Sequence, residues 1–139
     1  MNLDTLEVPR IRHGLEGSRI LIIEEEPIIG LTEAEILVGA GCQVVGPAAT
    51  VAEAARLIAT TTVDAAIVDA TIKSKRTGEI LAALTTQNIP FAVVTAFGPV
   101  HGRTRLPRRF RDAAILDKPF KARHLVAVVE ALLNPRFAK

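Results

Sequence analysis

Residues 20–27 read Ile-Leu-Ile-Ile-Glu-Glu-Glu-Pro, an apolar run that is followed by three acidic residues and a proline. Four apolar residues in a row are too few for a helix and are typical of a strand buried on both faces of a sheet. Three acidic residues follow directly, and Pro27 suits the first turn of a helix. The stretch therefore predicts a buried strand, an acidic turn and then a helix.

The same alternation of short apolar strand and helix continues along the chain. Thr50 and Glu53 form a T-x-x-E pattern, which predicts that a helix begins there with a capping box. Glycine and proline interrupt residues 98–112, so we expect only a short or irregular fourth helix in that segment. The expected strands span residues 20–23, 43–46, 65–68, 91–94 and 113–116, and the other expected helices begin at Pro27, Thr50, Gly78 and Ala122.

Short strands that alternate with helices predict the α/β class. Parallel neighbours require crossover connections, and right-handed crossovers place helices on both faces of a sheet. We therefore expect a parallel five-stranded sheet that is covered by helices on both sides.

Length and composition indicate one folded domain. The chain has 139 residues, which is within the size that a single core serves well. Hydrophobic residues make up 49% of the chain and charged residues 23%, which excludes an intrinsically disordered protein. We expect an N-terminal extension at residues 1–18, the folded domain at residues 19–134 and a C-terminal tail at residues 135–139.

The sequence also argues against membrane proteins and disulfide-stabilised proteins. No apolar run approaches the roughly 20 residues that cross a bilayer, and residues 1–18 lack the apolar centre of a signal peptide. We therefore expect a cytoplasmic protein with no membrane contact. Cys42 is the only cysteine, so an internal disulfide and a cysteine-rich metal site are excluded.

Polar residues follow four of the five expected strands. They are Glu24 with Glu25, Asp69, Thr95 and Lys118. Because the carboxyl ends of parallel strands meet at one edge of a sheet, we expect these side chains to converge on one site. Neighbouring carboxylates repel one another and favour a cation, and oxygen ligands select a hard ion such as Mg²⁺.

The same cluster holds the groups that phosphoryl transfer requires. A cation, a lysine and a hydroxyl together stabilise the charge on a transferring phosphoryl group. A carboxylate is the natural nucleophile in this set, because aspartate can form an acyl phosphate. Asp69, at the end of the central strand, is the candidate.

Four motifs, ILIIEEEP, AAIVDATI, FAVVTAFG and ILDKPF, occur in this order along the chain. Together they resemble the receiver domain of bacterial two-component response regulators, over residues 19–134. The combination of a lone aspartate, a Thr-Ala pair and an Asp-Lys-Pro-Phe ending is specific, whereas each motif alone is weak. The resemblance implies a stand-alone receiver with a flavodoxin-like (βα)5 three-layer sandwich and the strand order 2-1-3-4-5.

The resemblance also implies which residues carry the chemistry. Asp69 is expected to be the phosphoacceptor in a reaction that depends on Mg²⁺. The side chains of Glu24, Glu25 and Asp69 and the backbone carbonyl of Thr71 are expected to hold the cation.

Two further residues complete the implied site, and two others depart from the family pattern. Thr95 is expected to move toward the phosphoryl group, and Lys118 to be its charge partner, followed by a cis bond to proline. Glu25 stands where the family usually has aspartate and reaches about 1.5 Å further, whereas Mg²⁺ demands near-ideal octahedral geometry. Ile115 stands where an aromatic switch residue is frequent, so another element has to report the state of the site.

These residues imply a signalling domain rather than an enzyme. A histidine kinase or a phosphotransfer protein is expected to phosphorylate Asp69, and the domain's own catalysis is limited to self-phosphorylation and self-dephosphorylation. The output is expected to pass through contact with a downstream protein target. Two alternatives stay open. One is a receiver-like interaction module that is not phosphorylated because of Glu25, and the other is a metal-dependent phosphatase or hydrolase, which is disfavoured because no dedicated general base accompanies Asp69.

Charge is distributed unevenly along the chain. Residues 1–70 hold eleven acidic and four basic side chains, whereas residues 71–139 hold four acidic and thirteen basic ones. Five arginines at positions 103, 105, 108, 109 and 111 have one aromatic residue among them and form no DNA-binding motif, so we expect no nucleic-acid partner. We expect this segment and the last helix to contact a protein partner. The sequence does not determine whether the chain forms a homodimer.

Overall fold

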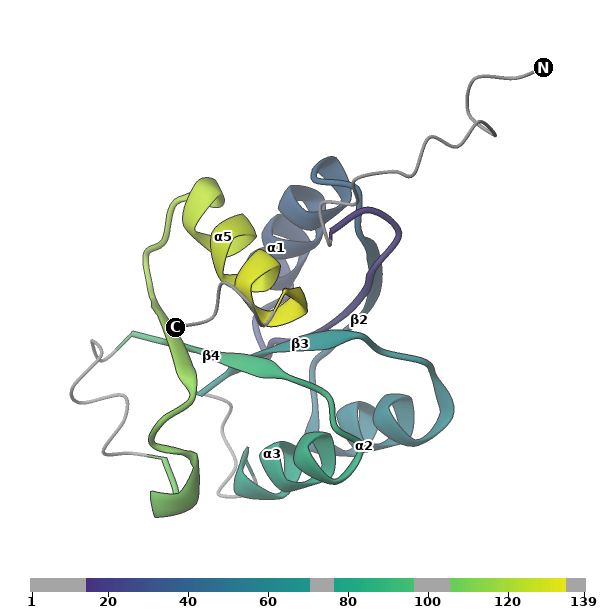
Figure 1. Cartoon of the computed structure of the whole chain (residues 1–139), viewed down its shortest axis with the longest axis vertical. Coiled ribbons are helices and arrows are strands. Elements are labelled where there is room, and N and C mark those ends of the chain that lie inside the picture. The colour runs from purple at the N-terminus through teal and green to yellow at the C-terminus, as the bar shows by residue number, and fades with distance from the viewer. Residues whose placement is uncertain (1–14, 71–76, 97–105, 135–139) are drawn as a thin grey trace.

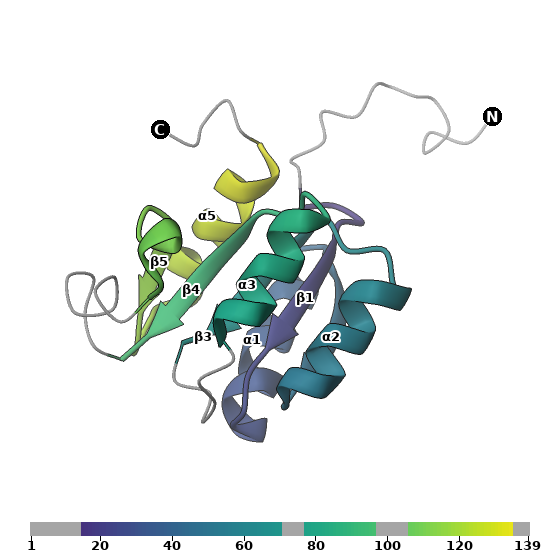
Figure 2. The same cartoon turned by 90° about the horizontal axis from the view of Figure 1, so that it is seen from below.

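Five parallel strands form one sheet in the order β2-β1-β3-β4-β5. The computed structural model describes residues 15–70, 77–96 and 106–134. Each neighbouring pair of strands is parallel, and the arrows of β1 and β4 point the same way in Figure 2. The strands are β1 (Arg19–Ile23), β2 (Gln43–Ala48), β3 (Ala65–Asp69), β4 (Phe91–Thr95) and β5 (Ala114–Asp117).

Helices cover both faces of the sheet. Figure 1 shows α1 and α5 on one side and α2 and α3 on the other. The helices are α1 (Pro27–Gly39), α2 (Val51–Thr60), α3 (Thr77–Thr86) and α5 (Ala122–Leu133). The expected α/β class, the three layers and the strand order are therefore confirmed.

A short 3-10 turn at Arg108–Phe110 precedes β5, and residues 106–113 hold no α-helix. The expectation of a short or irregular fourth helix is confirmed for these residues, and residues 98–105 lie outside the described part of the chain. The turn is anchored by Phe110, which is buried and meets the ring of Phe91 edge-on at 6.1 Å. The guanidinium of Arg109 lies over the ring of Phe110, 4.6 Å from its centroid.

Strand β2 is longer than the sequence predicts. It continues past Gly46 to Ala48, although Pro47 cannot donate a ladder hydrogen bond. β2 tolerates proline because it is an edge strand, and its pairing with β1 shifts register between Leu21 and Ile23. Gly46 has φ +93°, and a Cβ there would lie 2.9 Å from the carbonyl oxygen of Ile22, so only glycine fits. The peptide bond between Gly46 and Pro47 is cis.

Almost all of the interior is apolar. All five residues of the central strand β3 are buried, and separate apolar clusters fill the two spaces between the sheet and its helices. Among the residues that the structure describes, four buried side chains are polar or charged: Glu24, Glu33, Asp69 and Thr95. Burial of a polar or charged group lowers stability unless the group has a partner. These four side chains therefore mark where the interior is less stable than an entirely apolar one would be.

The last residues of the expected extension pack against the domain. Leu15 is buried in the cluster between the sheet and the layer of α1 and α5. The backbone N–H of Gly17 donates to the carbonyl of Gly41 at 2.8 Å. Cys42 is buried close to the end of α1. No helix in the described ranges is both long and apolar enough to cross a bilayer.

The sequence correctly predicts how α2 begins. The N–H of Glu53 donates to Oγ1 of Thr50 at 3.1 Å, which is one half of a capping box. The carboxylate of Glu53 accepts from the N–H of Ala49 at 3.2 Å, one residue earlier than in the standard box. Two N–H groups near the helix start are thereby satisfied by side chains.

Thr50→Ala should therefore destabilise the domain by about 1 kcal/mol, the usual cost of losing an N-cap hydroxyl. Chemical denaturation of both proteins measures this difference. Thr60→Ala is the matched control, because the Thr60 hydroxyl is exposed and only returns to the carbonyl of Arg56 in the last turn of the same helix. Equal losses in the two variants would contradict a capping role for Thr50.

Candidate functional site

The parallel register brings the ends of four strands to one edge of the sheet. Ile23 pairs with Val68, Asp69 pairs with Val94 and Thr95 pairs with Asp117. Glu24 directly follows β1 and Lys118 directly follows β5. The residues at the ends of β1, β3, β4 and β5 therefore meet, as expected from the spacing of the motifs.

Lys118 joins carboxylates from two other strands. Its Nζ lies 3.4 Å from Oδ1 of Asp69 and 3.3 Å from Oε1 of Glu24. The contact with Asp69 has hydrogen-bond geometry, whereas the contact with Glu24 is an ion pair without a hydrogen bond to Oε1. Both carboxylates are almost fully buried, with 2% exposure for Asp69 and 1% for Glu24. Three groups from distant parts of the chain thus form one cluster.

The cluster has less positive than negative charge, and the pKa values reflect this. Burial, reinforced by the hydrogen bond and charge of Asp69, raises the pKa of Glu24 to about 7. Burial acts to lower the pKa of Lys118, but the carboxylates of Asp69 and Glu24 outweigh it and raise that pKa. One ammonium group carries less charge than two carboxylates and the neighbouring Glu25 when all are ionised, so this arrangement favours a further cation.

The other predicted site residues lie around this cluster. Thr95 is fully buried at the end of β4, and its backbone carbonyl accepts from the N–H of Lys118 at 2.8 Å. Glu25 follows Glu24 and is half-buried. The bond between Lys118 and Pro119 is cis, as expected. Thr71 lies outside the described residues.

The donors present at the site suit a hard divalent cation. Carboxylate oxygens are the ligands that Mg²⁺ prefers, and the hydrogen-bonding capacity of Glu24 Oε1 is unused. Within the described ranges, no three carboxylate, imidazole or thiolate side chains already stand together as a ligand set. This is consistent with Lys118 standing within 3.4 Å of both buried carboxylates. Binding of a cation to these carboxylates would require the ammonium group of Lys118 to move partly away from them.

Glu33 is a further buried acid, which none of the sequence motifs includes. It lies on α1 with 1% exposure, and no donor from the described residues reaches either of its carboxylate oxygens. Burial, followed by the charge of Glu24, raises the pKa of Glu33 to about 8. The signal that could have found it is its spacing, because Gly30, Glu33 and Leu37 form the buried face of the helix.

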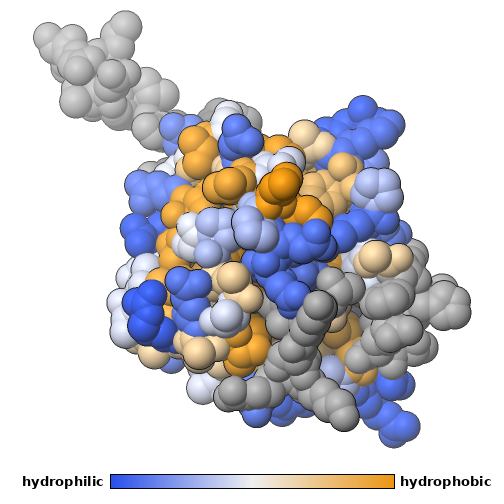
Figure 3. Space-filling view, turned by 180° about the vertical axis from the view of Figure 1, so that it is seen from behind, coloured by the Kyte–Doolittle hydropathy of each residue, from blue (hydrophilic) through white to orange (hydrophobic). Residues whose placement is uncertain are grey.

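The outward side of α1 is unusually apolar. Ile28, Leu31 and Val38 are large apolar residues that remain 58% to 79% exposed. Figure 3 shows the face of the molecule behind the view of Figure 1, where apolar residues gather in the upper part. A cavity of about 450 Å³ opens between α1 and the segment that follows β5, and its walls are mainly apolar. It is lined by Ile29, Thr32, Ile36, Ala96, Lys118, Pro119 and Phe120.

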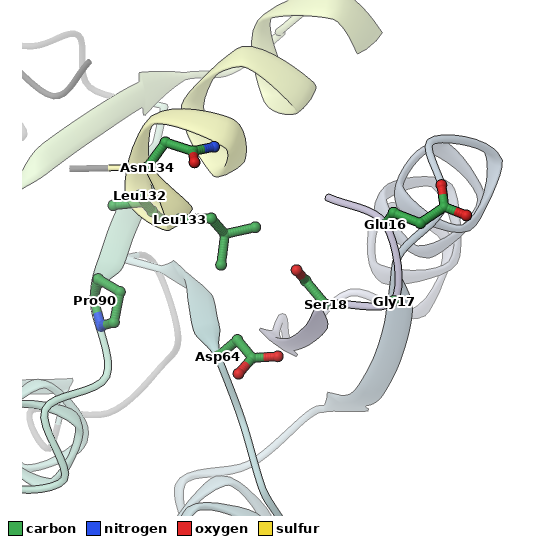
Figure 4. A pocket seen from close by; sticks show the side chains of 8 residues that line it. All are labelled: Glu16, Gly17, Ser18, Asp64, Pro90, Leu132, Leu133 and Asn134. Carbon is green, nitrogen blue, oxygen red and sulfur yellow. The ribbon is translucent and has the colours of Figure 1, made fainter. Parts of the chain in front are cut away.

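A second hollow lies at the opposite edge of the sheet. It has a volume of about 510 Å³ and is bordered by Ser18, Asp64 and the end of α5 (Figure 4). Asp64 directly precedes β3, a whole strand away from Asp69, and accepts from the N–H of Arg19 at 2.8 Å. None of the predicted site residues borders this hollow, so it is separate from the acidic cluster.

Solved structures similar to this chain are receiver proteins of several organisms. The chain is 30% identical to SdrG from Pseudomonas melonis Fr1 in its BeF3-activated conformation, with a TM-score of 0.70, and the match covers 85% of this chain and 98% of SdrG. It is 24% identical to a response regulator receiver protein from Sinorhizobium medicae WSM419, covering 88% of this chain and 98% of that one, with a TM-score of 0.73. A CheY-like receiver domain from Methanospirillum hungatei JF-1 is 22% identical, with coverages of 87% and 97% and a TM-score of 0.74. No family model and no curated protein matches the sequence.

The raised pKa of Glu33 predicts that stability falls as pH rises. In buffer free of divalent cations, the contribution of the neutral Glu33 carboxyl to the free energy of unfolding is complete below its unfolded pKa of 4.5. This contribution is lost as pH approaches about 8, because the buried carboxyl must then ionise. Glu33→Gln cannot ionise, so the decrease in unfolding free energy between about pH 5 and 8 should shrink by about 1–3 kcal/mol. Denaturant unfolding across this range measures the change.

Glu24 has a pKa raised to about 7 and should account for part of the decrease that remains. The control is Glu35→Gln, an exposed position on the same helix, which should keep the wild-type pH profile. An unchanged profile in Glu33→Gln would show that this carboxyl does not titrate in the native protein.

Proposed function

Because this chain belongs to the response-regulator receiver family, we propose that it is a phosphoacceptor switch whose phosphoryl group is carried by Asp69. The donor is a histidine kinase or a phosphotransfer protein that presents a phosphohistidine. The observation that supports this function best is the contact of the buried Asp69 with Lys118 and, through it, with Glu24. A nucleophile, a charge partner and a cation ligand thereby share one site.

In the proposed reaction, a carboxylate oxygen of Asp69 attacks the phosphorus atom. A phosphorus–oxygen bond forms, the bond between phosphorus and the donor's imidazole nitrogen breaks, and the nitrogen keeps the electron pair. Lys118 stabilises negative charge on the phosphoryl oxygens, and the hydroxyl of Thr95 donates to one of them. The resulting acyl phosphate shifts the population between two conformations of the domain.

Glu24, Glu25 and Asp69, together with the carbonyl of Thr71, are the proposed ligands of Mg²⁺. When bound, the cation would supply charge stabilisation for the phosphoryl oxygens. Glu24 suits this role because its buried carboxylate lacks enough counter-charge. Glu25 has one more carbon atom in its side chain than the usual aspartate, so its carboxylate can reach further from the backbone.

We assign the apolar side of α1 to the phosphodonor protein. A donor has to bring its histidine to Asp69, so it must dock beside the carboxyl edge of the sheet. Ile28 and Leu31 are exposed at the start of α1, close in sequence to the acidic turn, and the apolar cavity there is lined by Lys118 itself. A protein surface with apolar side chains fits this face. Contact of a downstream target with the segment that holds Arg103, Arg105, Arg108, Arg109 and Arg111, and with α5, is a separate prediction.

Intact-mass spectrometry after incubation with Mg²⁺ and a small phosphodonor tests the proposed function. The wild-type protein should gain the mass of one phosphoryl group, because Asp69 is a nucleophile beside a lysine and a cation site. Asp69→Asn should gain nothing, whereas Asp112→Asn, an exposed aspartate, should gain the group as the wild type does.

The same experiment separates the two alternatives. No gain by the folded wild-type protein, from a small donor or from a phosphorylated histidine protein, would favour an interaction module that works without phosphorylation. Sustained turnover of phosphoesters would favour a phosphatase.

A further inference from the structure

Within the described ranges, Glu33 is the one buried polar side chain that the proposed reaction does not use. Among the described residues, the other buried polar groups are Glu24, Asp69 and Thr95, and all three lie at the carboxyl edge of the sheet. Glu33 is 1% exposed, and neither of its carboxylate oxygens accepts a hydrogen bond from that part of the chain. A carboxyl in this situation is costly, and an apolar residue of similar size would stabilise the fold.

The position of Glu33 links it to the acidic cluster rather than to an independent part of the core. Gly30 precedes it by one helical turn on the buried face of α1. A Cβ at Gly30 would lie 3.6 Å from the Cβ of Glu24, so this face of the helix stands directly against the start of the site. The charged groups that act on Glu33 are Glu24 after β1, Lys118 after β5 and Asp69 on β3.

Lys118 does not satisfy Glu33, because its Nζ is already shared by Glu24 and Asp69. Buried carboxyl groups in folded proteins nearly always have a partner, either a protein donor or ordered water. Two of the proposed cation ligands, Glu24 and Asp69, act on Glu33 through their charges, and Mg²⁺ keeps several of its water molecules when it binds to protein. Such water molecules are donors and would supply the hydrogen bonds that the carboxylate oxygens of Glu33 do not receive from the described residues.

We propose that Glu33 is a fourth carboxyl of the cation site, acting as an outer ligand that accepts hydrogen bonds from cation-bound water. This inference rests on the proposed function, because it requires a divalent cation among Glu24, Glu25 and Asp69. Glu33 is thus a positioning residue that orients the hydration shell, and the charge of a bound cation would favour its ionised form, which adds negative charge behind Glu24. Outer partners of this kind contribute measurably to metal affinity.

Calorimetric titration of Mg²⁺ into the unphosphorylated full chain tests the role of Glu33. Glu33→Leu should weaken binding by about 10- to 100-fold, the usual effect of removing an outer partner. Glu33→Gln should fall between the wild type and Glu33→Leu, because its amide oxygen still accepts hydrogen bonds but carries no charge. Glu35→Gln, an exposed acid on the same helix, should bind like the wild type.

Thermal unfolding without divalent cations supplies the second readout. Glu33→Leu should unfold at a Tm equal to or above that of the wild type, because it removes a buried carboxyl that has no donor. Addition of Mg²⁺ should then raise the Tm of the wild type more than that of Glu33→Leu. Lower cation affinity in a protein that is at least as stable cannot be explained by a damaged fold.

Three results would overturn the inference, and they separate it from the proposed function. If folded Glu33→Leu and Glu33→Gln bind Mg²⁺ like the wild type while Asp69→Asn binds it weakly, Glu33 is not an outer ligand and the phosphoacceptor site stands. If Glu33→Leu is strongly destabilised, Glu33 is a structural residue, and unchanged affinity of folded Glu33→Gln would confirm that reading. If the wild-type protein binds no divalent cation, the inference and the proposed Mg²⁺ dependence fail together.

Discussion

Lys118 makes the ion pairs on which the candidate site depends. Its ammonium group lies within 3.4 Å of buried carboxylates that follow or end two other strands. These groups meet only because all five strands are parallel and finish at the same edge of the sheet. A carboxylate left in this interior without its lysine would be strongly destabilising, so the fold and the charge cluster depend on each other.

The arrangement of strands and most of the site follow from the amino-acid pattern. Ile20 to Ile23 and Ala65 to Val68 are too short and too apolar to be anything but buried strands, and polar residues mark where each one ends. Predictions from local sequence failed where contacts between distant parts of the chain determine the structure. Pro47 and Gly46 predict the end of β2, yet the strand continues because an edge position tolerates proline and a positive φ. Leu15 has no periodic neighbours, and its burial depends on the space beneath α1 and α5.

Glu33 shows a different limit of sequence reasoning. Charged residues on a helix normally face water, so an acidic residue within an otherwise apolar helix suggests its exposed side. In α1 the relation is reversed, since Ile28 is 79% exposed and Glu33 is buried. Stability alone gives no reason for this arrangement. It becomes understandable if the outer side of α1 serves a protein partner and its inner side serves the cation site, because functional sites commonly sacrifice stability.

The direct measurement for the central claim is the response of backbone amide NMR signals to beryllium fluoride and Mg²⁺, which together imitate a phosphoryl group on a carboxylate. If Glu24, Asp69, Thr95 and Lys118 form one site, their amide signals should shift together at the same ligand concentration in the wild-type protein. Asp69→Asn should show no such response. Shifts confined to one of the four positions, or an undiminished response in Asp69→Asn, would contradict the account.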